Sequence, residues 1–214
     1  MSYTSNIKRI SRGVLFVIEG IDGSGKTTQA KRLAASLASD GYDVLSLREP
    51  TDGKWGKEIR DAAHANKSRR DPEQEYRLFL MDRRQNVEEN IAPGLSAGRI
   101  VILDRYYFST MAYQGARGID PKRIRIENEA FAPVPDRVFY ISITVAEGLQ
   151  RISRGRGGFT SFEQEEYLNR VREIFDEHLT CLPFVVSVDG MCRPDEIFDE
   201  IKRTAAEFLD TLAS

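Results

Sequence analysis

Short runs of apolar residues alternate along this chain with longer stretches in which apolar residues recur at helical spacing. The apolar runs predict five strands, at residues 14–19, 43–48, 100–104, 137–142 and 184–189. Strands that alternate with helices in this way are typical of a parallel sheet with helices packed on its faces. The pattern therefore predicts an α/β fold with three layers, in which a five-stranded parallel sheet is flanked by helices.

Several of the predicted helices carry boundary signals in the sequence. A helical stretch at residues 29–39 is followed by Gly41, and an aspartate precedes a proline at 71–72 and again at 120–121. Aspartate as the N-cap with proline at the first helical position predicts helices that begin at residues 72 and 121. Thr144 and Glu147 form a capping box, which predicts a helix from residue 145, and a further helix is expected from about Phe162.

Composition and charge limit the class of protein. A chain of 214 residues with 41% hydrophobic residues can bury one sizeable core, so a single domain over 1–214 is expected, with the polar residues 1–12 as a flexible tail. A net charge of −2 predicts no nucleic-acid partner, and no apolar run is long enough for a membrane span or signal peptide. Cys181 and Cys192 are the only two cysteines, which suits a reducing, cytoplasmic location without a disulfide framework, and neither has metal-ligand spacing.

A phosphate-binding loop stands directly after the first predicted strand. It has the pattern G-x-x-x-x-G-K-[ST] and consists of Gly20, Ile21, Asp22, Gly23, Ser24, Gly25, Lys26, Thr27 and the following Thr28. In such a loop, glycines allow backbone N–H groups to surround a polyphosphate, the lysine reaches the terminal phosphates, and the threonine hydroxyl binds Mg²⁺. The alternative is a glycine-rich turn before a helix. The motif indicates a nucleoside triphosphate but does not specify a reaction.

Charged residues follow two other predicted strands. In an open parallel sheet, ligands bind at the carboxyl ends of the strands, which directs attention to Asp104, Arg105 and residues 48–50. Arg105 could bind an acceptor phosphate and Asp104 could hold the metal, although a surface ion pair at a strand end would look the same. The chain lacks the Asn-Lys-x-Asp motif of GTPases. Separate donor and acceptor phosphate sites favour a small-molecule kinase over a hydrolase.

A segment rich in arginine and glycine lies at residues 151–158, between two predicted helices. Arginines interspersed with glycines do not form a core, and a cationic loop can close over a phosphate chain and exclude water. We therefore expect a mobile, arginine-rich lid at about residues 151–163. A solvated basic surface loop is the alternative.

Four blocks in the same order show that the sequence resembles thymidylate kinases over nearly the whole chain. They are E-G-x-D-G-x-G-K-T-T-Q at residues 19–29, R-E-P at 48–50, L-F-x-x-x-R at 78–83 and D-R-Y-x-x-S-x-x-A-Y-Q-G at 104–115. The resemblance implies a nucleoside monophosphate kinase with the P-loop fold. It also implies roles for individual residues.

The implied base pocket is formed by four residues. Phe79 would stack on the pyrimidine ring, and Arg83, one helical turn later, would donate a hydrogen bond to a base carbonyl. Ser109 and Gln114 would line the same pocket. Without the resemblance, Phe79 would be assigned to the core.

The resemblance also implies residues that bind the sugar and the acceptor phosphate. Tyr113 would crowd the 2′ position and favour deoxyribose, and Asp22 would accept a hydrogen bond from the 3′-hydroxyl group. Arg105 would bind the acceptor phosphate. Glu49 would lie near the metal and this phosphate, with Pro50 shaping the turn.

The catalytic residues implied by the resemblance include an arginine from the lid. In this family a catalytic arginine comes either from the phosphate loop or from the lid, and the loop position here is Gly23. Arg154 and Arg156 are then the leading candidates, and Arg151 would contact adenine or have a structural role. The basic residue that commonly precedes the Phe-Glu pair at 162–163 is missing, which leaves the choice between the arginines open.

The implied reaction is phosphorylation of dTMP to dTDP by ATP and Mg²⁺, a step of dTTP biosynthesis. Phosphorylation of another pyrimidine deoxynucleotide such as dUMP, or nucleotide binding without turnover, are the alternatives. Family members commonly form homodimers, for which the apolar face of the predicted helix at residues 71–92 could serve.

Overall fold

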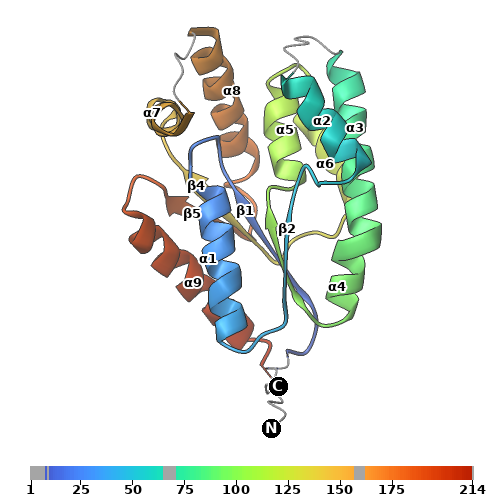
Figure 1. Ribbon diagram of the computed structural model, residues 1–214, viewed down its shortest axis with the longest axis vertical. Coiled ribbons are helices and arrows are strands. Elements are labelled where there is room, and N and C mark those ends of the chain that lie inside the picture. The colour runs from blue at the N-terminus through green and yellow to red at the C-terminus, as the bar shows by residue number, and fades with distance from the viewer. Residues whose placement is uncertain (1–7, 9, 65–70, 157–161, 214) are drawn as a thin grey trace.

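A five-stranded, all-parallel sheet forms the centre of the protein (Figure 1). The computed structural model describes residues 8, 10–64, 71–156 and 162–213. The strand order is β2-β3-β1-β4-β5. The strands are β1 (Val14–Glu19), β2 (Val44–Arg48), β3 (Ile100–Asp104), β4 (Arg137–Ser142) and β5 (Val185–Asp189). The predicted parallel α/β sheet is confirmed, and both β2 and β5 begin one residue later than predicted.

Helices cover both faces of the sheet. They are α1 (Lys26–Ser39), α2 (Lys54–His64), α3 (Pro72–Asn86), η1 (Val87–Ile91), α4 (Ala92–Ser96), α5 (Tyr107–Gly115), α6 (Pro121–Glu129), α7 (Val145–Arg156), α8 (Phe162–His178) and α9 (Pro194–Asp210). Helices α1 and α9 pack on one face, and α3, α5 and α8 contribute to the core on the other (Figure 1). In the described part of the chain, no helix has the length and apolarity needed to cross a bilayer.

The central strand β1 shows why runs of consecutive apolar residues predicted the strands of this sheet. In β1, Phe16 and Ile18 belong to the core beneath α1 and α9, whereas Leu15 and Val17 belong to the core on the opposite face. Every residue of β1 is buried. A strand covered on both faces must be apolar at consecutive positions, because side chains alternate between the two faces. The chemistry is therefore confined to the strand ends.

The helix-boundary predictions hold in part. Asp120 Oδ1 accepts a hydrogen bond from Lys122 N at 3.0 Å, and Thr144 Oγ1 accepts one from Glu147 N at 3.2 Å. The N-cap Asp71 makes no side-chain capping bond. The single helix expected at residues 71–92 is instead α3, the π-helical segment η1 and α4. Pro93 is the second residue of α4, the helix that follows η1, and it has no N–H, which interrupts the regular hydrogen-bond ladder.

Two other expectations need correction. Residues 8 and 10–12 are not a free tail, because Ile10 pairs with Ala213 and Ser11 N donates to Leu212 O at 3.1 Å. The arginine-rich segment begins as helix rather than loop, since α7 continues to Arg156. Residues 1–7 and 157–161, and the side chains of Arg154 and Arg156, lie outside the described residues.

Candidate active site

The phosphate loop occupies the turn between β1 and α1. Gly23 and Gly25 have positive φ angles of 83° and 94°, which residues other than glycine rarely adopt. A Cβ atom at Gly23 would also lie 2.4 Å from the carbonyl oxygen of Gly148 in α7, so this position has no room for a side chain. The backbone N–H groups of the loop and the positive end of α1 therefore form an anion-binding turn.

Lys26 is buried at the start of α1 and is 5% exposed. Its Nζ donates a hydrogen bond to Ile21 O at 2.6 Å. Burial, and next the positive charge of Arg105, lower the pKa of Lys26 to about 7, against the opposing effect of nearby carboxylates. A bound phosphate chain would supply negative charge at this point and favour the ammonium form.

Thr27 and Asp104 form the candidate metal site. Thr27 Oγ1 donates to Asp104 Oδ2 at 2.6 Å, which joins the start of α1 to the end of β3. Asp104 is 4% exposed, and its Oδ1 has no hydrogen-bond partner within residues 10–64, 71–156 and 162–213. A hydroxyl beside a buried carboxylate with an unpaired oxygen fits Mg²⁺, which prefers oxygen ligands.

Arg105 lies one residue beyond β3 with a φ angle of 73°. This left-handed conformation directs its side chain back to the phosphate loop, where it forms an ion pair with Asp22 and donates to Ser109 Oγ at 3.1 Å. Burial opposes ionisation of Asp22 and is the largest single effect, but the positive charges of Arg105 and Lys26, together with hydrogen bonds, lower the pKa of Asp22 overall. Arg105 therefore pairs with the loop and not with Asp104, contrary to the surface ion-pair interpretation.

Glu19 holds the segment that follows Arg105, a role that the sequence analysis missed. This fully buried carboxylate accepts hydrogen bonds from Tyr106 N at 2.8 Å, Ser109 N at 3.1 Å and Ser109 Oγ at 2.6 Å. It thus caps the N-terminus of α5 from another strand. Burial raises the pKa of Glu19. The available signal was an acidic residue at the end of an otherwise apolar strand.

A cavity of about 250 Å³ lies beside Arg105 and is the candidate acceptor pocket. It collects every residue predicted to bind the acceptor: Asp22, Glu49, Pro50, Phe79, Arg83, Arg105, Ser109, Tyr113 and Gln114. Five lining residues were missed: Glu75, Tyr106, Thr110, Arg117 and Tyr167. Phe79 lines this cavity and is only partly buried, so it is not simply a core residue.

Tyr113 and Tyr167 close one side of this cavity. Tyr113 OH accepts a hydrogen bond from Asp22 N at 3.1 Å, and its ring centre lies 5.3 Å from the Arg105 guanidinium. Tyr167 comes from α8 and donates to Tyr113 O at 2.9 Å. The helix that follows the expected lid therefore reaches the acceptor pocket directly.

Arg83 is the most deeply buried charge of the pocket, at 1% exposed. Its Nε and Nη2 both lie 2.8 Å from Glu49 Oε2, its Nη1 donates to Asn128 Oδ1 at 2.7 Å, and its Nη2 donates to Thr110 Oγ1 at 3.0 Å. The other oxygen of Glu49 accepts from Asn86 Nδ2 at 3.0 Å. Glu49, expected near the metal and phosphate, thus uses both oxygens to hold Arg83 and Asn86.

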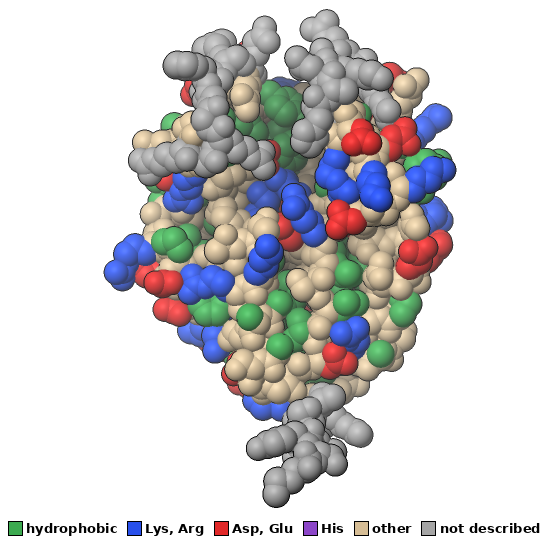
Figure 2. Space-filling model, in the orientation of Figure 1, with side chains coloured by type: hydrophobic (Ala, Val, Ile, Leu, Met, Phe, Trp, Pro, Cys, Tyr) green, Lys and Arg blue, Asp and Glu red, His purple; other side chains and the backbone are tan. Residues whose placement is uncertain are grey.

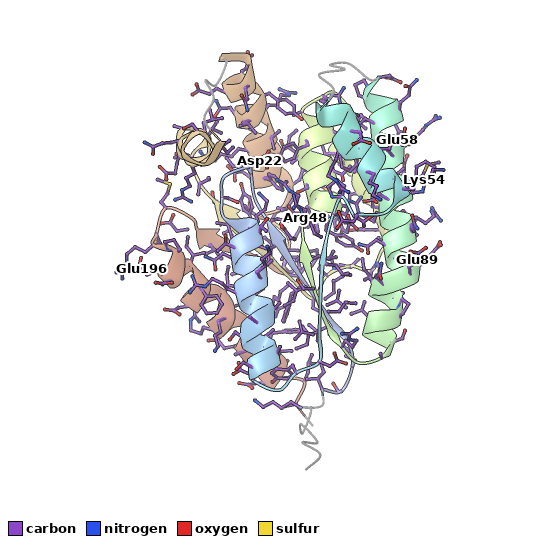
Figure 3. All side chains as sticks on the ribbon, viewed as in Figure 1. Asp22, Arg48, Lys54, Glu58, Glu89 and Glu196 are labelled. Carbon is purple, nitrogen blue, oxygen red and sulfur yellow. The ribbon has the colours of Figure 1, made fainter. Side chains whose placement is uncertain are left out.

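A second cavity of about 550 Å³ lies on the β2 side of the metal site. Its lining includes Thr27 and Asp104 as well as the cations Arg48 and Arg60. Figure 2 shows lysine and arginine side chains gathered across the middle of this face. Figure 3 shows Asp22 and Arg48 at the same edge of the sheet, where β1 and β2 end.

On the other side of the phosphate loop, Arg151 joins α7 to the segment after β5. Its Nη2 donates to Gly190 O at 2.9 Å, and its Nε pairs with Glu147 at 2.7 Å. Arg151 thus has a defined structural position. The lid arginines Arg154 and Arg156 are at the end of the same helix, but their side chains are outside the described residues.

A family model and curated relatives of this chain all carry the description thymidylate kinase. A family model described as thymidylate kinase matches residues 18–192. The chain is 42% identical over 197 residues to a probable thymidylate kinase of Archaeoglobus fulgidus, covering 92% of this chain and 97% of that protein. It is 43% identical over 203 residues to a thymidylate kinase of Akkermansia muciniphila, covering 95% and 94%. A thymidylate kinase of Desulfotalea psychrophila is 45% identical over 190 residues, covering 88% and 92%.

Proposed function

The chain belongs to the thymidylate kinase family, and we propose that it transfers the γ-phosphoryl group of ATP to dTMP, giving dTDP and ADP. It is a phosphotransferase of the nucleoside monophosphate kinase class. The observation that carries the proposal is that the phosphate loop and the acceptor cavity share Asp22, which forms an ion pair with Arg105 in the cavity lining. Donor and acceptor phosphates would then meet at one point.

The protein's part in the reaction is to position the two phosphates and to stabilise charge. The loop N–H groups and Lys26 would bind the donor phosphates. Arg105 would release its ion pair with Asp22 and bind the acceptor phosphate instead. The transferred group carries its charge on the equatorial oxygens, so fixed cations around it lower the barrier. Asp22, once released, is free to accept from the 3′-hydroxyl group.

Magnesium would be held by Thr27 Oγ1 and by the unpaired oxygen of Asp104. When bound, it would neutralise part of the phosphate charge and orient the donor. The short bond between these two side chains keeps both donor atoms at the same edge of the loop.

The acceptor pocket would bind thymine and deoxyribose mainly through residues of two helices, α3 and α5. Phe79 would stack on the base, Arg83 would donate to a base carbonyl, and Ser109 would keep Arg105 in place. Tyr113 would lie against the sugar, where its ring leaves no space or partner for a 2′-hydroxyl group.

We propose that the catalytic arginine, which would stabilise the charge of the phosphoryl group during transfer, comes from the lid. Arg154 and Arg156 are the candidates because Gly23 cannot supply it and both belong to α7, whose Gly148 lies against Gly23 of the phosphate loop. Arg151, fixed to Gly190, would form one wall of the adenine site. Substitution of Arg154 or Arg156 by alanine should lower kcat with little change in dTMP affinity.

We also propose a homodimer formed through α3 and α6. These helices adjoin one another through hydrogen bonds such as Tyr76 OH to Glu127 at 2.8 Å, and they expose Met81 and Ile126 at 46% and 70%. Large exposed apolar side chains on adjoining helices favour an isologous contact with a second copy. Light scattering should give twice the chain mass, and Ile126→Glu should shift the species toward the monomer.

The location we propose is the cytoplasm. Cys181 and Cys192 are both exposed and carry free thiols, which suits a reducing compartment. The phosphoryl donor proposed for the enzyme is plentiful there. Fractionation of the source cells would test this assignment.

The test of function is product formation with a panel of acceptors. The protein is incubated with ATP, Mg²⁺ and dTMP, dUMP, dCMP, UMP or AMP, and each diphosphate is quantified by anion exchange. Formation of dTDP at the highest kcat/KM supports the proposal. Preference for dUMP would reassign the acceptor, whereas absence of any diphosphate would leave a nucleotide-binding protein without catalytic activity.

A further inference from the structure

Gln114 contains an unsatisfied polar atom at the wall of the acceptor cavity. The residue is 3% exposed, and its Nε2 donates to Glu75 Oε2 at 3.2 Å. Its carbonyl oxygen, Oε1, is buried and has no hydrogen-bond partner within the described ranges. A buried acceptor without a donor is unfavourable, so a ligand that brings an N–H group to this atom would gain from binding it.

Glu75 determines which end of the Gln114 amide remains unpaired. A carboxylate only accepts hydrogen bonds, so it binds the NH₂ end of Gln114 and repels the carbonyl end. Arg117 forms an ion pair with the same oxygen of Glu75, which holds the carboxylate in place. The orientation of the amide therefore follows from the charge of Glu75.

The same cavity also presents a hydrogen-bond donor. Arg83 has five N–H groups, and the bonds to Glu49, Asn128 and Thr110 use four of them. The fifth, on Nη1, takes part in none of these contacts, and a guanidinium group has no acceptor to offer instead. The wall thus combines one fixed donor with one fixed acceptor.

This pair of groups distinguishes between pyrimidines. Thymine and uracil present a carbonyl oxygen at C4 next to an N–H at N3, which complements a donor and an acceptor. Cytosine presents an amino group at C4 next to an acceptor nitrogen, so both contacts would be mismatched. Mismatched buried hydrogen bonds reject a ligand far more strongly than a missing apolar contact does.

We propose that Glu75 is a positioning residue that fixes Gln114 Oε1 as an acceptor and thereby makes the site select 4-oxo over 4-amino pyrimidine nucleotides. The inference rests on the proposed function, because it concerns the base of the same acceptor. Glu75 acts through Gln114 and has no part in phosphoryl transfer.

The test is Glu75→Gln, with Glu73→Gln as the matched control. A neutral amide at position 75 can donate as well as accept, so Gln114 can turn and present its NH₂ group to the base. The ratio of kcat/KM for dTMP to that for dCMP should fall by about 10-fold in Glu75→Gln. Glu73 lies on the same helix and pairs with Arg123 away from the cavity, so Glu73→Gln should keep the wild-type ratio.

A second variant covers the case in which Glu75→Gln does not fold. Gln114→Met keeps the length of the side chain but removes the acceptor, and it should reduce the same ratio by a similar factor through loss of dTMP turnover. A ratio within about twofold of wild type in an active variant overturns the inference but leaves the kinase assignment intact. A wild-type enzyme that phosphorylates dTMP and dCMP equally well also overturns it. Absence of turnover with every acceptor defeats the proposed function as well.

Discussion

The wall of the acceptor pocket and the phosphate centre are both buried and charged, but they satisfy their charges differently. In the pocket wall, Arg83 is paired with Glu49 and bonded to Asn128, and Glu49 uses its second oxygen on Asn86. At the phosphate centre, Lys26 donates to a backbone carbonyl. One oxygen of Asp104 there has no partner among the residues that the structure describes.

This difference predicts that the charges of the pocket wall contribute mainly to the stability of the fold, and those of the phosphate centre mainly to the reaction. A buried ion pair whose partners all come from the protein is already complete before substrate binds, and breaking it leaves an uncompensated charge. A buried charge whose partner is the ligand destabilises the free protein slightly and becomes favourable when phosphate or metal arrives. Substitutions in the two regions should therefore affect different measurements.

The largest effect is expected for Lys26→Met. Loss of the ammonium group at the donor phosphates should lower kcat by about 10³-fold. The melting temperature should not fall, because an apolar side chain of similar length replaces a buried cation whose pKa is already lowered to about 7. Steady-state kinetics and thermal melting on the same preparation would check both points; a large fall in melting temperature would show that Lys26 also has a structural role.

Arg83→Met, unlike Lys26→Met, should lower stability as well as weaken dTMP binding. It leaves Glu49 and Asn128 buried without their partner, so the free energy of unfolding should decrease by about 3–5 kcal/mol. Urea denaturation monitored by circular dichroism measures the change. The double variant Arg83→Met/Glu49→Gln should recover part of the loss, and no recovery would mean that the pair is not the source of the stability.

Asp104→Asn should have a smaller effect, which is on the binding of Mg²⁺. The amide keeps the shape and can still accept from Thr27, but it removes the negative charge offered to Mg²⁺. The Mg²⁺ concentration for half-maximal activity should rise by about 10- to 100-fold, and the unfolding free energy without metal should stay within about 0.5 kcal/mol. Activity titrations with Mg²⁺ give the first number. An unchanged Mg²⁺ requirement would place the metal elsewhere.

The smallest effect is expected at the boundary between the two regions, with Tyr113→Phe. The variant loses the hydroxyl that accepts from Asp22 N at 3.1 Å, while the ring beside Arg105 remains. The loss should be about 1 kcal/mol, or roughly fivefold in KM for dTMP. KM for ATP, measured in the same assay, serves as the internal control, and an equal rise there would argue against a role on the acceptor side.

The two regions also differ in how far the sequence predicted them. The phosphate loop, Thr27 and Asp104 could be predicted because a contiguous motif and the strand ends place them together whatever the details of packing. The partners of Arg83 could not, because Glu49 and Asn128 lie 34 and 45 residues away and meet it only through tertiary packing. The left-handed φ of Arg105 and the capping of α5 by Glu19 likewise depend on neighbouring strands.

The most direct test of this division is the double variant Lys26→Met/Asp104→Asn, studied by calorimetric titration with dTMP and by dTDP formation. We expect the Kd for dTMP to remain within about threefold of wild type while dTDP formation falls by at least about 10³-fold. Loss of dTMP binding together with turnover would contradict the account, because the acceptor pocket would then depend on the phosphate centre. Retention of turnover would contradict it equally.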